Sequence, residues 1–326
     1  MKPATMKLGQ LIVIVIAAVS AISAHAVTSI NLSNYQVTGN FALDTLNGMG
    51  LEASAVTYAR DRGSLFFVGD EGLGVVEISR AGQTLSTMTF SGGTNLGWPT
   101  TSTNRDAEGL TYLGGGVLVI AEERLQDAFR FTYVAGGSVN LANADFASIG
   151  GNAGNLGTEG ISYDPRDGSF VSVKQNAPQD ILAGSLSFAQ GGGTSAMTQL
   201  FNPSLLGLSS LSDVQTLSPV DALTGFAAAD NLLILSLDSH LLLEVDRNGG
   251  ILSSFDLAGV TQQAIEGVTV DEFGTIYLVA EDSGFGNSRL ITLAAPVPEP
   301  EVWGMLMAGL GLLGFVARRR RKAVVQ

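Results

Sequence analysis

The chain contains no cysteine, and only two of its 326 residues are histidine. The absence of cysteine excludes a disulfide-stabilised scaffold, thiolate catalysis and cysteine-ligated metal sites. Basic residues are also scarce in the central body. Residues 27–295 hold 28 of the 30 acidic residues but only 10 of the 17 lysines and arginines, a net charge of −18. So acidic a body repels nucleic acid, and no nucleic-acid partner is expected. Its carboxylates favour solubility and divalent cations, although most are expected to be ordinary surface charges.

Long apolar runs are confined to the two ends of the chain. Lys2 and Lys7 precede an apolar run over residues 11–22, and Ala24 and Ala26 then stand three residues and one residue before a cleavage site. A positive start, a short apolar run and an A-x-A site predict a helical secretory signal peptide over residues 1–26. The alternative is an anchor that is not cleaved.

The C-terminal segment, residues 295–326, combines a Pro-rich break, an apolar run and a basic cluster. The apolar run covers residues 302–317, and Arg318–Arg321 with Lys322 follow it. We expect the basic cluster to stay in the cytoplasm, so that the preceding chain faces outward. The run is short against the ~20 residues that span a bilayer, and the alternative is a marginal permanent anchor.

This C-terminal segment resembles a known sorting signal. Pro298-Glu299-Pro300, the short Gly- and Leu-rich run and the arginine cluster are similar, in this order, to the PEP-CTERM sorting signal. The resemblance implies export by a Gram-negative bacterium, a membrane helix and an exosortase-type processing enzyme as a partner. The protein would first be anchored facing the periplasm, and would reach the cell surface or the extracellular space after processing. The signal indicates where the protein is sent, and it does not indicate an activity.

The body contains an internal repeat, and each unit begins with an acidic residue. The stretch "EGLTYLGGGVLVIAEE" starts at Glu108, and similar stretches start at Glu159 and Glu266. Aligning the acid before each inner apolar run gives spacings of 56, 51, 54 and 53 residues. The aligned acids are Glu52, Glu108, Glu159, Asp213 and Glu266. A period near 50 residues indicates a solenoid, a propeller or an array.

Each repeat is expected to contain four short strands separated by turns rich in glycine and aspartate. Four strands in about 50 residues describe a propeller blade. The sequence therefore predicts an all-β protein, a β-propeller of five four-stranded blades over residues 27–294. The fifth repeat lacks its fourth strand before the Pro-rich segment. Residues 34–43 are expected to supply this strand and close the ring, which removes exposed sheet edges.

The repeats also resemble a known family. "LEASAVTYARDRGSLFFVGDEG" from Leu51 and "IEGVTVDEFGTIYLVAED" from Ile265 are similar to the SdiA-regulated family, over roughly residues 31–294. The resemblance implies a five-bladed propeller, distantly related to NHL-repeat propellers, with a bound calcium ion and no established activity. The fourth repeat departs from the pattern because it has no E-G pair, and the third carries Lys174-Gln175 where others end in acids. A more remote resemblance is to the esterase-like phytases.

In a β-hairpin, the start of the first strand lies beside the end of the second strand. This rule places Glu108 near Glu122 and Glu123, and a similar pairing is expected in two other blades. The pairs there are Glu52 with Asp70 and Glu71, and Glu266 with Glu281 and Asp282. Because the first strand of a blade lines the central channel, these acids are expected to converge on one mouth.

Crowded carboxylates repel one another, and a hard divalent cation relieves this repulsion. Calcium accepts about 6–8 oxygen ligands in loose geometry, whereas magnesium demands tighter octahedral order, so calcium is the expected ion. The candidate ligands are Glu52, Glu108, Glu159, Glu266 and Asp213, of which Asp213 is the weakest. The alternative is that each acid caps its own hairpin, with Glu159 paired to Lys174.

Two functions stay open. In the first, the chain is a non-catalytic surface or matrix module that binds an exopolysaccharide or a surface protein, with calcium bracing the ring. In the second, it is a calcium-dependent hydrolase, such as an esterase, a lactonase or a phytase-like enzyme. His240 is the one histidine outside the predicted signal peptide, and we expect it to be a turn residue. Its adjacency to Ser239 and Asp238 is not triad geometry, and no G-x-S-x-G motif occurs. No catalytic residue is assigned, which favours the first function.

Overall fold

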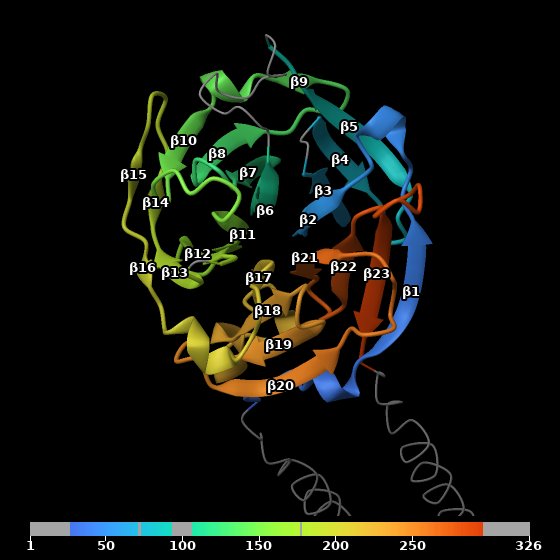
Figure 1. The fold of residues 1–326 in the computed structure, drawn as a ribbon, viewed down its shortest axis with the longest axis vertical. Coiled ribbons are helices and arrows are strands. Elements are labelled where there is room, and N and C mark those ends of the chain that lie inside the picture. Colours follow the sequence, from blue (N-terminus) through green and yellow to red (C-terminus); the bar gives the residue numbers. More distant parts are fainter. Residues whose placement is uncertain (1–26, 71–72, 93–105, 177, 296–326) are drawn as a thin grey trace, which may run out of the picture.

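The computed structural model describes residues 27–70, 73–92, 106–176 and 178–295. In this part of the chain, five sheets surround one axis, and the first strand of each sheet is the innermost (Figure 1). The predicted five-bladed propeller is therefore confirmed. Among the described residues, no helix is long and apolar enough to cross a bilayer. The predicted signal peptide and the predicted membrane helix lie outside these residues.

The blades follow the order of the chain, and the strands of each blade run antiparallel from the axis outward. Blade 1 consists of β2 (Ala53–Ala59), β3 (Ser64–Gly69), β4 (Gly74–Ile78) and β5 (Thr84–Phe90). Blade 2 consists of β6 (Ala107–Gly114), β7 (Val117–Glu122), β8 (Asp127–Thr132) and β10 (Asp145–Ser148). Blade 3 consists of β11 (Thr158–Asp164), β12 (Ser169–Lys174), β13 (Asp180–Gly184) and β16 (Thr198–Gln199). Blade 4 consists of β17 (Asp213–Thr216), β18 (Leu232–Ser236), β19 (Leu241–Val245) and β20 (Ile251–Asp256). Blade 5 consists of β21 (Ile265–Val270), β22 (Ile276–Ala280), β23 (Arg289–Ala294) and β1 (Gln36–Ala42).

Three kinds of feature are additional to the regular repeat that the sequence predicts. A short strand, β9 (Ser138–Val139), pairs parallel with β5 and adds a fifth strand to blade 1. Blade 3 carries an extra hairpin of β14 (Leu186–Ser187) and β15 (Thr194–Ser195). Short 3₁₀ helices fill connections, two of them inside the enlarged first hairpin of blade 4. They are η1 (Leu32–Asn34), η2 (Leu46–Gly48), η3 (Leu141–Asn143), η4 (Pro203–Leu206), η5 (Asp221–Leu223) and η6 (Ala227–Asp230).

The second strand of each blade is buried on both faces, because each blade packs between two others. In β3, all six residues are buried, and β18 and β22 are buried along their whole length. Continuous apolar runs are typical of strands covered on both faces. The apolar core consists of layers between adjacent blades: Phe66 of blade 1 packs with Leu118 of blade 2, and Leu233 of blade 4 packs with Leu278 of blade 5.

The N-terminal strand closes the ring as predicted. β1 pairs antiparallel with β23 from Gln36 opposite Ala294 to Ala42 opposite Arg289. The fourth strand of blade 5 thus comes from the opposite end of the propeller sequence. Figure 1 shows β1 at the outer edge of this blade. The closure leaves the edge of β23 paired.

Hydroxyl groups link each inner strand to the next. In four of the five junctions between inner strands, a Thr or Ser hydroxyl accepts a backbone N–H from the neighbouring blade. The bonds are Tyr112 N to Thr57 Oγ1 (3.1 Å), Tyr163 N to Thr111 Oγ1 (2.9 Å), Thr216 N to Ser162 Oγ (3.0 Å) and Tyr58 N to Thr269 Oγ1 (3.1 Å). At the fifth junction the hydroxyl of Thr269 donates to Gln215 Oε1 at 2.9 Å. The inner strands therefore form a ring of side-chain hydrogen bonds.

The segment that precedes β1 is fastened to blade 4 by one buried carboxylate. Glu244 on β19 has no solvent exposure, and its two oxygens accept five hydrogen bonds. The donors are Ser29 Oγ (2.5 Å), Ile30 N (3.0 Å), Asn31 N (3.2 Å), Asn231 Nδ2 (2.8 Å) and Ser253 Oγ (2.8 Å). The carboxylate fastens residues 29–31 to blade 4, and the same segment continues as β1 in blade 5. The closing segment is therefore attached to two blades.

We expect Glu244→Ala to destabilise the fold by about 2–4 kcal/mol, because it leaves several buried donors without their charged acceptor. Urea unfolding of the full chain measures this change. The exposed Asp238 in the same blade provides a control, and Asp238→Ala should change the free energy of unfolding by less than about 0.5 kcal/mol. Equal effects of the two substitutions would contradict the role of Glu244.

Candidate metal centre at the acidic mouth

The beginnings of three inner strands, β6, β11 and β21, meet around a cavity of about 230 Å³. Seven acidic residues line this cavity, together with one arginine and two neutral polar residues. We call the cavity the acidic mouth, and its residues are Asp70, Asp106, Glu108, Glu123, Glu159, Glu266, Glu281, Arg124, Asn155 and Gln175. Carboxylates from blades 1, 2, 3 and 5 and from the connection between blades 1 and 2 therefore share one small space.

A β-bulge points the central glutamate of each of these strands toward the acidic mouth. The pairing register shifts between Ala107 and Gly109 in β6, and the same shift surrounds Glu159 in β11 and Glu266 in β21. The extra residue of a bulge is left out of the ladder and its side chain is re-aimed. The bulge thus explains why a glutamate lies at the start of an otherwise apolar strand.

The glycine after each glutamate lets the blades approach closely. A Cβ on Gly160 would lie 2.4 Å from Asp213 Oδ1 in blade 4, and a Cβ on Gly267 would lie 2.8 Å from the carbonyl oxygen of Ser54 in blade 1. Both distances are shorter than real Cβ contacts. The E-G pair therefore combines one residue that faces the cavity with one that permits contact between inner strands.

Burial and mutual repulsion keep these carboxyl groups protonated to higher pH than usual. Burial raises the pKa of Glu108 well above its usual range, and the charges of Glu159 and Glu266 raise it further. The pKa of Glu159 is raised by burial and then by Glu123. Burial, followed by the charge of Glu281, raises the pKa of Glu266 to about 8. Burial and the neighbouring Asp106 raise the pKa of Asp70 to about 7.

Three of these carboxylates are placed as a set of metal ligands. One oxygen each of Asp70, Asp106 and Glu108 lies within 4.8 Å of the others. Asp106 is 4% exposed, and its Oδ2 accepts no hydrogen bond within the described part of the chain. Arg124 Nη2 lies 2.7 Å from this oxygen, but only as an ion pair without hydrogen-bond geometry. Arg124 supplies a single positive charge among seven acidic residues, so the arrangement fits an additional cation such as a metal ion.

Comparison with family models identifies the body of the chain. Residues 27–287 match the model of the SdiA-regulated family. The chain belongs to the SdiA-regulated family. Residues 296–321 match the PEP-CTERM protein-sorting motif. Both resemblances that the sequence indicates are thereby confirmed.

Solved structures similar to this SdiA-regulated chain are remote. The β-propeller domain of Cps50 (Swd1) from Myceliophteria thermophila is 12% identical with a TM-score of 0.37, and the match covers 71% of this chain and 63% of that one. A luciferin-regenerating enzyme is 9% identical with a TM-score of 0.46, covering 79% and 95%. A catalytically inactive virginiamycin B lyase from Staphylococcus aureus, bound to quinupristin, is 13% identical with a TM-score of 0.38, covering 74% and 66%. These likenesses carry no information on function.

Of the five acids predicted as ligands in this SdiA-regulated propeller, three line the acidic mouth and two do not. Glu108, Glu159 and Glu266 line it, whereas Glu52 and Asp213 are not among its lining residues. Glu52 lies beside the mouth: its carbonyl oxygen accepts the N–H of Asp70 at 2.9 Å. Asp213 is buried between blades, where it accepts Val214 N–H at 2.8 Å and Val268 N–H at 2.7 Å. Ligation by these five residues stays a prediction.

The cross-blade hydrogen bonds show which residues of the other two blades are equivalent to the glutamates. Each inner-strand amide that bonds to a neighbouring hydroxyl stands four residues after the equivalent position. Counting back gives Ser54 in blade 1, Glu108 in blade 2, Glu159 in blade 3 and Ser212 in blade 4. In blades 1 and 4 a serine occupies the position of the glutamate. The sequence alignment of acid with acid was therefore wrong by two residues in blade 1 (Glu52 instead of Ser54) and by one in blade 4 (Asp213 instead of Ser212).

The hairpin rule identified some neighbours of these glutamates but missed one ligand candidate. Glu123 and Glu281 line the acidic mouth with Glu108 and Glu266, as expected, whereas Glu122 is buried and its Oε2 accepts Leu125 N–H at 2.6 Å. Glu71 lies outside the described residues. Asp106 was not predicted as a ligand, since it belongs to the segment that enters β6. The one available signal was its position two residues before Glu108, which places both residues on the same side of an extended chain.

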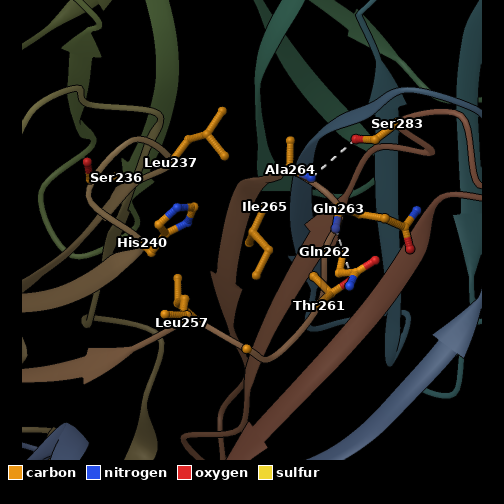
Figure 2. Close-up of a pocket in the computed structure, with 12 residues that line it drawn as sticks. Ser236, Leu237, His240, Leu257, Thr261, Gln262, Gln263, Ala264, Ile265 and Ser283 are labelled. Atoms are coloured by element: carbon orange, nitrogen blue, oxygen red, sulfur yellow. Dashed lines mark hydrogen bonds between the residues drawn. The ribbon is translucent and has the colours of Figure 1, made fainter.

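His240 lies in a separate pocket between blades 4 and 5. It occupies the turn after β18 in a left-handed backbone conformation (φ 51°), so it is a turn residue, as expected. Figure 2 shows its imidazole beside Leu237 and Leu257, facing Ile265. Among the described residues that line this pocket, none is acidic. The hydroxyl of Ser239 accepts the N–H of Ser209 at 2.8 Å, and within the described residues no hydrogen bond joins the His240 imidazole to Ser239 or Asp238.

The raised pKa of Glu266 predicts a pH-dependent stability in the absence of metal. The folded state binds this proton more tightly than the unfolded chain does, so stability falls as pH rises from about 4.5 to about 8. With a chelator present, the melting temperature of the full chain should therefore fall between about pH 5 and about pH 8. Glu266→Gln should reduce this fall, and an unchanged pH profile in this variant would contradict the assignment.

Proposed function

We propose that this SdiA-regulated propeller is a calcium-binding module of the cell surface that binds a partner without catalysis. The PEP-CTERM motif implies an exported protein, sorted to the cell surface and processed by an exosortase-type system. Before processing, the apolar run over residues 302–317 anchors the chain in the membrane after removal of the signal peptide. The propeller then faces the periplasm, and later the cell exterior. Its partner is an exopolysaccharide or another surface protein.

The observation that carries the calcium site is the excess of seven carboxylates over one guanidinium in a small cavity, with oxygens of Asp70, Asp106 and Glu108 within 4.8 Å of one another. All of the acidic ligands offer oxygen, which hard cations prefer over the nitrogen and sulfur ligands of zinc. Calcium tolerates irregular sets of about 6–8 oxygens, whereas magnesium retains water and needs octahedral order. Asp70, Asp106 and Glu108 would hold the ion, with Glu159 and Glu266 close by.

Calcium at this position would brace the ring. The mouth combines β6, β11 and β21 with the β3–β4 turn of blade 1 and the connection between blades 1 and 2, so a bound ion reduces repulsion among segments far apart in sequence. Extracellular calcium modules bind with dissociation constants of about 10⁻⁴–10⁻³ M, and an exported protein needs no tighter affinity. The ion would therefore contribute to the stability of the exported propeller.

Isothermal titration of the metal-stripped full chain should detect calcium binding. Calcium at about a hundredfold excess over the dissociation constant should raise the melting temperature by roughly 5 to 10 °C. Glu108→Gln should remove most of this increase, because Glu108 belongs to the set of three close carboxylates. No binding at millimolar calcium would overturn the calcium site.

Glu52→Gln provides a matched variant, because Glu52 is next to the mouth but does not line it. Its calcium response should stay close to that of the wild type. A loss as large as that of Glu108→Gln would instead make Glu52 a ligand, as its sequence position predicts.

The hydrolase alternative is tested with ester, lactone and phosphoester substrates, with and without calcium. We expect no calcium-dependent turnover, since His240 lies in a pocket separate from the acidic mouth. Reproducible turnover that requires calcium and disappears in Glu108→Gln would replace the binding module with an enzyme.

The sorting tail gives an independent prediction. Replacing Arg318–Arg321 with neutral residues should cause the protein to be mislocalised, because the basic cluster fixes the orientation of the preceding apolar run. Fractionation of the producing cells measures this effect. Unchanged localisation would show that the cluster does not act in sorting.

A further inference from the structure

The opposite mouth of the channel holds a second cavity, of about 470 Å³, to which all five blades contribute. Its residues come from the far ends of the inner strands, whereas the acidic mouth uses their beginnings. Thr57 and Tyr58 of blade 1, Tyr112 of blade 2 and Tyr163 of blade 3 line it, with Gln215 of blade 4 and Thr269 of blade 5. We call this cavity the tyrosine mouth. Its volume is in the range of small-molecule sites.

The tyrosine mouth is close to electrically neutral, in contrast to the acidic mouth. The charged residues that line it are Arg60 and Asp61. Arg60 is held by Asp221 in a two-pronged ion pair at 2.7 and 2.8 Å. Asp61 accepts the N–H of Gly115 at 3.0 Å. Since Arg60 is already paired with Asp221, a phosphate or a carboxylate finds no free cation here, and Asp61 alone gives a divalent cation no cluster of acids.

Hydroxyl donors in this mouth lack an acceptor. Thr57 and Thr111 are buried, and each hydroxyl oxygen already accepts an N–H from the next blade. In the part of the chain that the structure describes, no acceptor receives the hydroxyl protons of these two threonines or of Tyr163. All three residues line the mouth. They can therefore donate to oxygen atoms of a ligand.

Apolar surface surrounds these donors. Pro165, Pro219 and Val270 line the same mouth, along with the partly exposed Tyr112 and Tyr163. Tyr112 is fixed by packing on Phe66, at 5.8 Å between ring centroids, and Tyr163 packs on Phe170 at 5.2 Å. Rings held in this way lose little entropy on binding a ligand. The mouth thus combines a rigid apolar wall with unpaired hydroxyl donors and no unpaired cation.

We propose that the tyrosine mouth binds a neutral hexopyranose unit of a polysaccharide. A pyranose ring has an apolar C–H face that suits the tyrosine and proline surfaces. Its hydroxyl and ring oxygens accept hydrogen bonds from the threonine and tyrosine hydroxyls, and its neutrality suits a mouth without an unpaired cation or a cluster of acids. The inference goes beyond the proposed function, because it names the ligand class and a site distant from the cation. It does not depend on calcium.

Titration of the full chain with neutral tetrasaccharides tests this proposal. The probes are cellotetraose, maltotetraose and mannotetraose, with tetragalacturonate as the acidic counterpart. We expect at least one neutral probe to bind with a dissociation constant below about 1 mM, and tetragalacturonate to bind at least tenfold more weakly. The absence of binding by every neutral probe at about 10 mM would overturn the proposal, as would preferred binding of the acidic probe.

Tyr163→Phe locates the binding, because it removes a hydroxyl that no other described residue uses. Loss of one hydrogen bond should weaken the bound neutral probe about threefold to tenfold. Tyr133→Phe is the matched control: it removes a buried hydroxyl outside the tyrosine mouth and should leave the affinity unchanged. Equal affinity of wild type and Tyr163→Phe would place the sugar elsewhere and overturn the assignment.

A calcium-free titration separates the two sites. With chelator present, the neutral probe should keep its affinity even if the calcium site is absent. Loss of saccharide binding on removal of calcium would mean that the sugar is held by the cation, which contradicts a site at the tyrosine mouth.

Discussion

Five inner strands run side by side around one axis, and this crowding determines what each mouth of the channel can hold. Backbone N–H groups of one strand donate hydrogen bonds to hydroxyl groups of the next strand, as Tyr163 N does to Thr111 Oγ1. Equivalent positions of different blades are therefore brought together, whatever their side chains are. Residues at the start of the strands gather into the acidic mouth, and residues near their ends form the tyrosine mouth.

The buried and crowded carboxylates of the acidic mouth destabilise the folded state, and the rest of the fold has to offset this effect. Burial first, and the charges of neighbouring carboxylates second, raise the pKa values of Glu108, Glu159 and Glu266, so these groups keep protons to a higher pH than usual. Arg124 offsets part of the negative charge by its ion pair with Asp106. A hard cation would replace the protons and link the same groups, so that a local source of instability becomes a contact between blades. The proposed calcium site would in this way help to hold the closed ring together.

The repeat made the fold predictable, because alternating apolar strands and Gly-Asp turns have few other packings. The closing role of β1 was predictable for the same reason, since the fifth repeat lacked an outer strand. The exact lining of the acidic mouth was not predictable, because a β-bulge re-aims one residue and breaks the simple alternation of faces. Thus Glu108 lines the mouth, while Asp213, one position out of phase, is buried between blades. Contacts that join distant segments, such as Glu244 with Ile30, leave no local pattern in the sequence.

The central claim is that one cation links several blades through the acidic mouth. Hydrogen exchange of the full chain, followed by mass spectrometry with and without calcium, tests it most directly. Calcium should slow exchange together at the beginnings of β6, β11 and β21, three segments that are far apart in sequence and share the cavity. Protection confined to a single blade, or no protection at all, would contradict the account.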